Sequence, residues 1–219
     1  MKKYIDIISK TPLFSGIKME DMEPMLQCLS YSISSFKKGD FIILEEDTVL
    51  NIGIILEGSI DMIKEDFWGN KTTLVRIKSG ELFGETFACS KDATSTVSFC
   101  AAYNTTVLFI PFNRVMHSCT MACSFHHRLV ENMVFLIAEK NKELMQKVEV
   151  ISKKTLREKI MAYLSIHAAA QGTQYFEIPL GRVELADYLC ADRSALTREL
   201  SNMQNEGLID FDRNTFRLL

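Results

Sequence analysis

The sequence predicts an α+β protein in which an antiparallel β domain, one long helix and a small helical unit with a β wing follow one another. Three observations carry this prediction. Short runs rich in Ile, Val, Phe and Thr alternate with turn residues between 32 and 111, a helical period without Gly or Pro covers 124–151, and helical periods return after 152 around one short strand. We therefore expect three regions, at 1–123, 124–151 and 152–219.

The composition fits two folding units of unequal size. Of 219 residues, 47% are hydrophobic and 24% charged, with only 4 Pro and 10 Gly, which excludes a disordered or collagen-like protein. The net charge of −3 supplies no global attraction to nucleic acid, so such a role needs a local motif. Because signal-peptide and membrane-span patterns are missing and the six cysteines are scattered, we expect a cytoplasmic protein with free thiols and no membrane partner.

Short helices and then short strands are expected in the first half of the chain. Pro12 and Gly16 interrupt the helical pattern of the first 30 residues. Strands are expected at 41–44, 52–56, 72–77 and 105–110, with turns at 38–40, 57–59, 69–70 and 79–81. So close a rhythm of strands and turns is typical of an antiparallel barrel or sandwich.

The long helix carries a heptad pattern. Its apolar positions recur at alternating steps of 4 and 3, and the series comprises Val130, Val134, Ile137, Asn141, Leu144, Val148 and Ile151. A polar residue such as Asn141 inside such a series fixes register and strand number in parallel coiled coils. We therefore predict that this helix pairs with a second copy of the chain. The alternative is a long helix that lies on its own domain.

The stretch 180–209 has the pattern of two helices joined by a tight turn. The inward faces are expected to comprise Leu185, Ala186 and Leu189 in the first helix and Leu196, Leu200 and Met203 in the second. The turn falls at 190–191, and Asp192 is placed to cap the second helix. With a short strand at 175–179 and a hairpin at 211–219, this order predicts a helix-turn-helix with a β wing.

Four polar side chains share the outer face of the second helix near its N-terminus: Arg193, Ser194, Thr197 and Arg198. In a helix-turn-helix these positions meet base edges in the major groove, where an arginine can pair with guanine in bidentate fashion. Residues 151–219 hold 9 Lys+Arg against 9 Asp+Glu, so we expect few phosphate contacts, at residues such as Arg182, Ser194 and Lys153. The alternative is an ordinary exposed helix face.

Taken in order, these features resemble the cAMP receptor protein and FNR family of transcription regulators. The resemblance rests on Gly58, on Phe83-Gly-Glu85, on the long helix and on the segment 192–200, and it spans nearly the whole chain. It implies a β-roll (a double-stranded β-helix of jelly-roll type) like a cyclic-nucleotide-binding domain. It also implies a parallel homodimer and a winged helix-turn-helix on palindromic double-stranded DNA. An activator would have RNA polymerase as a further partner.

The resemblance places Arg193, Ser194 and Arg198 at the base-contacting positions. Cyclic-AMP-binding members have a glutamate at the middle position, which accepts from a cytosine amino group. Ser194 cannot reproduce that contact, so we expect a different half-site. Cys190 stands where many members have a turn glycine, and a positive φ there would carry backbone strain.

The resemblance also implies an effector site. Gly84, Glu85, Ser95 and Thr96 fall in the loop that holds the phosphate of a cyclic nucleotide, and Lys140 and Asn141 fall where the family contacts adenine. Ser95 stands where nucleotide-binding members have an arginine. A buried cyclic phosphate would therefore lack its charged partner. We expect no cAMP binding, and an unidentified small molecule if the protein has an effector.

Cofactors of the FNR type are not expected. No cysteine precedes Cys28 and no C-x-x-C occurs, so the cysteine group that holds an iron–sulfur cluster in FNR is missing. Cys119, Cys123 and His127 are spaced to share one helix face, which raises metal or thiol sensing as an alternative. Three ligands are too few for a closed zinc site, and we predict no metal.

Two other classes of protein remain as alternatives. A cupin-like enzyme needs histidines inside its barrel, whereas the four histidines lie in the helical parts, at 117, 126, 127 and 167. We therefore predict that the protein is not an enzyme. The other alternative is a ligand-binding regulatory module that acts through protein contacts instead of DNA.

Overall fold

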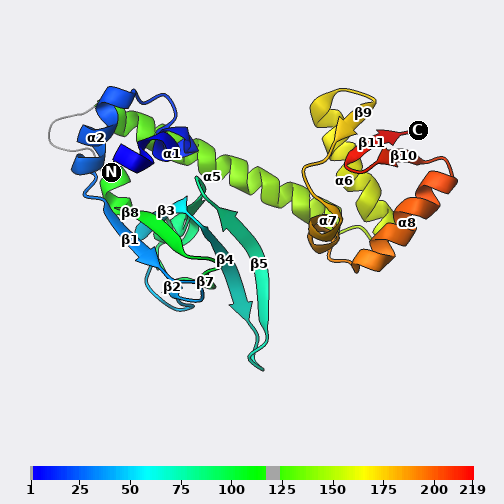
Figure 1. Cartoon of the computed structure of the whole chain (residues 1–219), viewed down its shortest axis with the longest axis horizontal. Coiled ribbons are helices and arrows are strands. Elements are labelled where there is room, and N and C mark those ends of the chain that lie inside the picture. Colours follow the sequence, from blue (N-terminus) through cyan, green and yellow to red (C-terminus); the bar gives the residue numbers. More distant parts are fainter. Residues whose placement is uncertain (1, 117–123) are drawn as a thin grey trace. The chain divides into compact units, whose positions relative to one another are not determined.

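The structure, a computed structural model, describes residues 2–116 and 124–219 (Figure 1). The chain divides into two compact units, Met1–Ala138 and Glu139–Leu219. The first holds two antiparallel sheets with flanking helices, and the second holds helices and one small antiparallel sheet. The predicted α+β class, with a β-roll, a long helix and a helix-turn-helix, is confirmed. Within the described ranges, no helix combines the length and apolar character that crossing a membrane requires.

Short helices open unit 1, as predicted. They are η1 (Lys2–Tyr4), α1 (Ile5–Lys10), η2 (Pro12–Phe14) and α2 (Met19–Cys28). Pro12 occupies the first position of η2, where its missing N–H costs no hydrogen bond. Leu13, Phe14 and Met25 are buried in one cluster with Ile52 and Leu108, which lie in the strands that follow, so these helices share a core with the roll.

The roll of unit 1 consists of two four-stranded antiparallel sheets. In the first, the order is β1 (Ser32–Phe36), β8 (Thr105–Pro111), β3 (Asn51–Glu57) and β6 (Leu82–Phe83). In the second, it is β2 (Phe41–Ile43), β7 (Ser98–Ala101), β4 (Ser59–Glu65) and β5 (Lys71–Lys78). Strands therefore form at all four ranges predicted for them. The β4–β5 hairpin extends away from the rest of the roll (Figure 1).

Side chains of both sheets fill the interior of the roll. Ile55 and Val107 from the first sheet join Ile60 and Phe99 from the second in one buried cluster. The alternation of buried and less buried residues that a sandwich requires is clear in β7 and β8, whereas β3 is buried along most of its length and β5 is exposed along most of its length.

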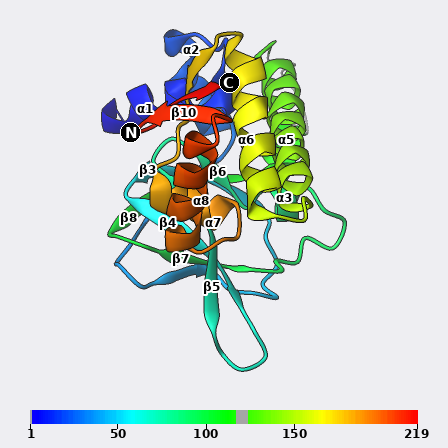
Figure 2. The same cartoon turned by 90° about the vertical axis from the view of Figure 1, so that its right-hand side faces the viewer.

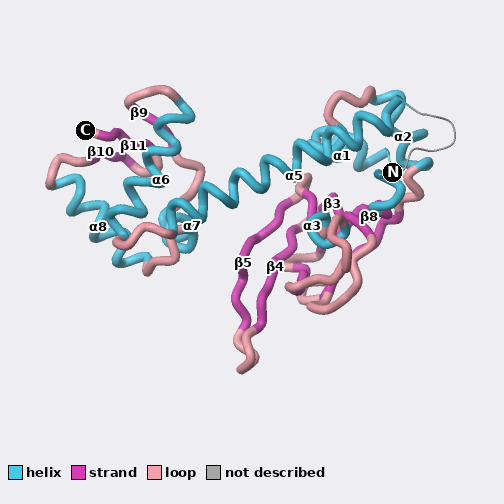
Figure 3. Tube along the Cα trace, turned by 180° about the vertical axis from the view of Figure 1, so that it is seen from behind, coloured by secondary structure: helices cyan, strands magenta, loops and turns pink. Residues whose placement is uncertain are grey.

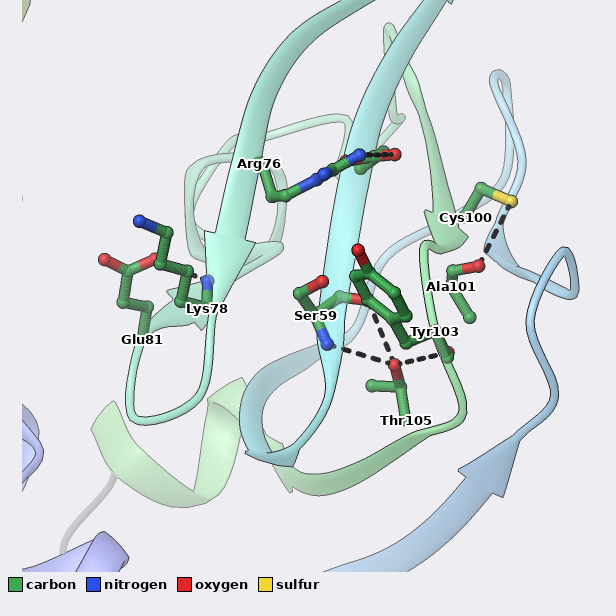
Figure 4. Close-up of polar contacts among 9 residues, drawn as sticks. Ser59, Arg76, Lys78, Glu81, Cys100, Ala101, Tyr103 and Thr105 are labelled. Atoms are coloured by element: carbon green, nitrogen blue, oxygen red, sulfur yellow. Dashed lines mark hydrogen bonds and ion pairs between the residues drawn. The ribbon is translucent and has the colours of Figure 1, made fainter. Parts of the chain in front are cut away.

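The turn between β3 and β4 is held by one threonine (Figure 4). The Thr105 hydroxyl accepts from the Ser59 amide at 3.3 Å and shares its one proton between the carbonyl oxygens of Tyr103 at 2.8 Å and Ser59 at 3.0 Å. Gly58 lies in this turn with φ +84, and a Cβ there would come within 2.5 Å of the Asn104 carbonyl oxygen. Only glycine fits so close an approach.

Helix α5 (Ser124–Ile151) has the predicted bounds, and the division between the units falls within it. In unit 1, Leu129 and Met133 are buried. The side-chain amide of Asn132 donates to the carbonyl oxygens of Leu13 at 2.9 Å and Ser15 at 2.8 Å, which ties the helix to the N-terminal segment.

Besides the C-terminal part of α5, unit 2 contains three helices, as predicted, and a three-stranded sheet. Figures 2 and 3 show these elements from two further sides. Its elements are α6 (Leu156–Gln171), β9 (Tyr175–Glu177), α7 (Arg182–Tyr188), α8 (Arg193–Asn205), β10 (Ile209–Asp212) and β11 (Thr215–Leu218). The sheet is antiparallel in the order β10-β11-β9. We call the β10–β11 hairpin the wing. Leu164, Leu200 and Phe216 lie in one buried core that joins helices and sheet.

Candidate nucleic-acid interface and sensor loop

Helices α7 and α8 form the predicted helix-turn-helix. The six expected inward positions, Leu185, Ala186, Leu189, Leu196, Leu200 and Met203, are all buried in the same cluster. Cys190 adopts φ +52 in the turn between the helices, so the anticipated left-handed backbone is present. The turn therefore carries the strain that a glycine would avoid.

Asp192 caps α8, as its position predicts. Its Oδ1 accepts from the backbone amides of Ser194 at 2.8 Å and Ala195 at 3.1 Å, and from the Ser194 hydroxyl at 2.5 Å. These hydrogen bonds, that of the hydroxyl above all, hold the pKa of the Asp192 carboxyl below its ordinary value. Asp192 is therefore ionised at neutral pH and satisfies amides that the helix leaves without partners.

The four predicted DNA-contacting side chains of α8 are all exposed. Three make contacts along the helix: Ser194 to Asp192, the Thr197 hydroxyl to the Arg193 carbonyl at 2.9 Å, and Arg198 Nε to the Ser194 carbonyl at 3.4 Å. Among the described residues, the Arg193 guanidinium has neither a hydrogen bond nor an ion pair. The structure thus brings two guanidinium groups and two hydroxyls together on one solvent-facing surface.

A charged network that the sequence analysis missed holds the far side of α8. Arg157 of α6 donates through Nε to Glu199 at 2.6 Å and through Nη1 and Nη2 to Glu206 at 2.6 and 2.9 Å. Its hydrogen bonds to Glu206 and Glu199 raise the pKa of Arg157, and Arg157 in turn lowers the pKa of Glu206. The network joins α6 to α8 and its C-cap across more than 40 residues of sequence, a separation that no local pattern signals.

Arg182, expected as a phosphate contact, is half-buried beside the wing. Its guanidinium carbon lies 5.0 and 5.2 Å from the ring centroids of Phe211 and Phe216, and its Nη2 donates to the Arg213 carbonyl at 2.7 Å. Burial lowers the pKa of the guanidinium from its ordinary value. The structure therefore places Arg182 against the wing. It contacts none of the four polar side chains of α8.

The loop at residues 84–96, where the effector site is expected, begins with a left-handed glycine. Gly84 has φ +78 and precedes the short helix α3 (Glu85–Ala88), in which Glu85 is 4% exposed. Ser95 is also buried. Its hydroxyl donates to the Val97 carbonyl at 2.6 Å, while its backbone pairs with Glu46 and Asp47. Ser95, which stands where nucleotide-binding members have an arginine, therefore points inward, and its hydrogen bonds hold the loop.

Lys64 reaches this loop from β4, a contact that the sequence analysis did not foresee. Its ammonium group donates to the Thr96 carbonyl at 3.0 Å and forms an ion pair with Glu45. The pairing of β4 with β7, in which Ile63 lies opposite Ser98, brings Lys64 beside Thr96. A cation is thus present at the loop, although it comes from β4 and not from position 95.

Exposed apolar side chains lie on both parts of α5. In unit 1, the exposed heptad positions are Val134 (59% exposed) and Ile137 (39%), while Val130 is half-buried. In unit 2, they are Leu144 (59%) and Val148 (53%). We call these exposed positions, together with Val130 and the exposed Asn141, the apolar stripe. Large apolar side chains in this number are costly to leave in water.

The remaining predicted residues are distributed as follows. Lys140 and Asn141 are exposed and belong to unit 2, whereas Gly84, Glu85, Ser95 and Thr96 belong to unit 1. Cys119 and Cys123 lie outside the described residues, and His127 is exposed on α5. Within the part that the structure describes, no group of three His, Cys, Asp or Glu side chains could hold a metal ion.

Two family models match the chain. Residues 33–119 match the cyclic nucleotide-binding domain, and residues 158–219 match the Crp-like helix-turn-helix domain. The first match covers the roll, and the second covers most of α6 and every element that follows it.

Comparable proteins match over most of their length. The transcriptional activator protein FnrA of Stutzerimonas stutzeri is 22% identical over 93% of this chain and 83% of its own, and the transcriptional activator protein anr of Pseudomonas aeruginosa is 23% identical over the same shares. Among solved structures, the catabolite activator protein of Thermus thermophilus is similar with a TM-score of 0.52 at 21% identity, covering 95% of this chain and 93% of that one. CprK complexed with OCPA gives a TM-score of 0.61 at 16% identity, covering 91% and 89%.

Proposed function

The chain belongs to the Crp/Fnr family of transcriptional regulators, and from that premise we propose that it is a sequence-specific regulator that binds palindromic DNA as a homodimer. Members of the family regulate transcription and are not enzymes. In the proposed organisation, residues 1–123 sense a signal, 124–151 pair the two copies and 152–219 bind DNA. One observation carries the proposal: an α8 capped by Asp192 that presents Arg193, Ser194, Thr197 and Arg198 to solvent.

In the proposed complex, the two arginines of α8 contact base edges. Each can donate two hydrogen bonds to guanine, which discriminates against another base by about 1–3 kcal/mol. The Ser194 hydroxyl proton is engaged by Asp192, so its oxygen is left to accept from a base amino group or from water. Thr197 supplies a methyl group for a thymine contact. Arg182 contacts the wing and none of these four side chains.

Dimerisation through the apolar stripe is the second part of the proposal. Burying Val134, Ile137, Leu144 and Val148 against a second copy removes apolar surface from water, and Asn141 at the same seam fixes a parallel register. Two α8 helices related by two-fold symmetry then meet half-sites about one helical turn apart.

The test of the dimer is a charged substitution in the stripe. Leu144→Glu with Val148→Glu is expected to give monomers in sedimentation velocity and to abolish binding to the full palindrome, since each monomer holds only one half-site. Glu149→Gln, at an exposed position of the same helix, is the matched control and should remain dimeric. A double variant that still sediments as a dimer contradicts this assignment.

The proposed sensor responds to a small molecule other than cAMP, held by Gly84, Glu85, Ser95 and Thr96 of the loop together with Lys140 and Asn141 of α5. The commitment of the Ser95 hydroxyl to the Val97 carbonyl supports this expectation, because no guanidinium is available there to pair with a cyclic phosphate. Calorimetric titration with cAMP should therefore give no heat of binding, and saturable binding would contradict it.

The decisive test of DNA recognition is selection of sites from a randomised duplex pool by the purified full chain, under reducing conditions at fixed moderate salt. We expect enrichment of a two-fold symmetric sequence with half-sites about 10 bp apart. Arg193→Ala with Arg198→Ala should abolish that enrichment and leave the dimer intact, whereas Arg114→Ala, at an exposed site of unit 1, should select the wild-type sequence.

Enrichment of the same sequence by the double variant would refute the base-contacting assignment. It would favour the alternative of a ligand-binding module that acts through protein contacts. We place the proposed function in the cytoplasm, and an activating role would add RNA polymerase as a partner.

A further inference from the structure

The wing tip is held by contacts from two directions. The turn between β10 and β11 contains Arg213, which has φ +51. From one direction, Arg182 Nη2 donates to the Arg213 carbonyl at 2.7 Å. From another, the amide of Ile178 donates to the Asn214 carbonyl at 2.9 Å. Successive carbonyl groups of the turn are therefore both engaged, and the backbone of the wing tip has a defined position in unit 2.

The Arg182 side chain is engaged by the wing through its aromatic rings and one backbone carbonyl. Its guanidinium contacts the rings of Phe211 and Phe216 at 5.0 and 5.2 Å, a geometry in which the cation interacts with both π systems. Its Nη1 atom is buried and has no hydrogen-bond partner in the part of the chain that the structure describes. Because a phosphate can reach this group only if the stacked arrangement opens, a direct contact would sacrifice both ring contacts and the carbonyl hydrogen bond.

Arg213, unlike Arg182, has a side chain without partners in unit 2. Its side chain is exposed, and its guanidinium forms no hydrogen bond or ion pair with any described residue. It sits at the tip of a hairpin whose backbone is fixed by Arg182. A solvated arginine on a rigid hairpin is well suited to a phosphate group, since little of its backbone freedom remains to be lost on binding.

We propose that Arg182 is a positioning residue that holds the wing tip, and that Arg213 is the side chain that contacts the DNA phosphates flanking each half-site. This inference rests on the proposed function, because it needs DNA on the α8 surface. It assigns the phosphate contact to a different arginine from the one expected from the sequence. The planar guanidinium is essential to the Arg182 role, since a lysine has the same charge but can neither stack flat on two rings nor reproduce the guanidinium fork.

The experiment measures the salt dependence of binding of the full chain to the site that the wild type selects. Arg213→Ala is expected to weaken binding to all sequences alike and to reduce the slope of log K against log[salt] by about 0.9 per contact, hence roughly 1.8 for a dimer. Arg182→Lys should give a similar loss despite its retained charge. The double variant should bind no more weakly than Arg213→Ala alone, because both changes remove the same contact.

Hydrogen exchange of the free protein tests the positioning role without DNA. Amides of residues 211–216 should exchange faster in Arg182→Lys than in the wild type, whereas Arg213→Ala, which keeps the carbonyl acceptor, should exchange like the wild type. Thermal unfolding of both variants establishes that unit 2 is folded at the temperature of the assay.

Three outcomes would overturn the inference. If Arg213→Ala binds DNA with the affinity and the salt slope of the wild type, the wing tip does not touch DNA. The proposed function would still hold in that case, because the wild type selects a DNA site. Wild-type binding by Arg182→Lys, with a lowered slope in Arg182→Ala alone, would show that Arg182 itself contacts phosphate. A wild-type chain that selects no sequence would refute the proposed function, and the inference with it.

Discussion

Replacing Gly53 by alanine isolates one steric contact in the roll. Gly53 of β3 pairs with Phe83 of β6, and a Cβ at position 53 would lie 2.3 Å from Cε1 and 2.4 Å from Cζ of the Phe83 ring. The Gly53 backbone is outside the left-handed region, so alanine meets no conformational obstacle there. The ring is what excludes the methyl group.

The cost follows from how firmly that ring is held. An ordinary carbon contact needs about 3.5 Å, so ring and strand must separate by roughly 1 Å. Phe83 is 2% exposed, and its ring packs against Phe99 at 5.3 Å and Phe109 at 6.2 Å between centroids. It therefore has no open side toward which to move. Overpacking of this kind costs about 1–3 kcal/mol, and we expect Gly53→Ala to destabilise the roll by that amount.

The assay is urea unfolding of the full chain followed by circular dichroism, with Phe83→Leu and the double variant alongside. Phe83→Leu alone should destabilise the roll by shrinking the side chain, but it also makes room for the methyl group. The double variant should therefore be more stable than the sum of the single effects predicts, by about 1 kcal/mol or more. Gly181→Ala is the matched control, because its added Cβ meets only Glu184 at 3.7 Å.

Two results would refute this reasoning. An unchanged or raised urea midpoint for Gly53→Ala would mean that the strand absorbs the methyl group without cost. Strict additivity in the double variant would mean that the loss arises somewhere other than at Phe83.

Three further predictions concern unit 2. Because the pKa of Asp192 is lowered in the folded protein, its cap stabilises unit 2 at pH values above the ordinary pKa of 3.8, and this contribution is lost as the pH falls below 3.8. In Asp192→Asn, the free energy of unfolding should therefore depend less on pH in this acid range. Burial lowers the pKa of His167 below 6.5, so unit 2 should lose stability as the pH falls below 6.5, and His167→Gln should remove that dependence. Arg157→Ala and Arg157→Lys should both lower the unfolding temperature of unit 2, because lysine cannot donate to Glu199 and bind Glu206 in bidentate fashion at once, and the loss should shrink in high salt.

Each of these predictions has a control. Asp187→Asn, His127→Gln and Arg114→Ala change exposed residues of the same types and should leave the respective curves unchanged. An acid limb that survives in Asp192→Asn, a slope below pH 6.5 that survives in His167→Gln, or full stability of Arg157→Lys would each contradict the contact invoked.

The sequence by itself determined the long helix, the helix-turn-helix and four strands of the roll, together with the surface proposed to recognise DNA. Helix α5 has the predicted bounds because a Gly- and Pro-free heptad pattern is a local signal. Asp192 caps α8 as predicted, and Leu196, Leu200 and Met203 are buried opposite the polar face. Capping and helical periodicity act over a few residues, so both can be predicted from a short stretch of sequence without knowledge of the rest of the chain.

Only the tertiary structure decided which groups these residues meet. Arg182 and the Arg213 carbonyl are 31 residues apart in sequence, Lys64 and Thr96 are 32 apart, and both contacts arise from the packing of separate elements. The sequence analysis expects Arg182 to contact phosphate, whereas in the structure its guanidinium lies against the rings of Phe211 and Phe216. Long side chains can reach several partners, and the choice among them depends on strand register and helix packing, which no local pattern specifies.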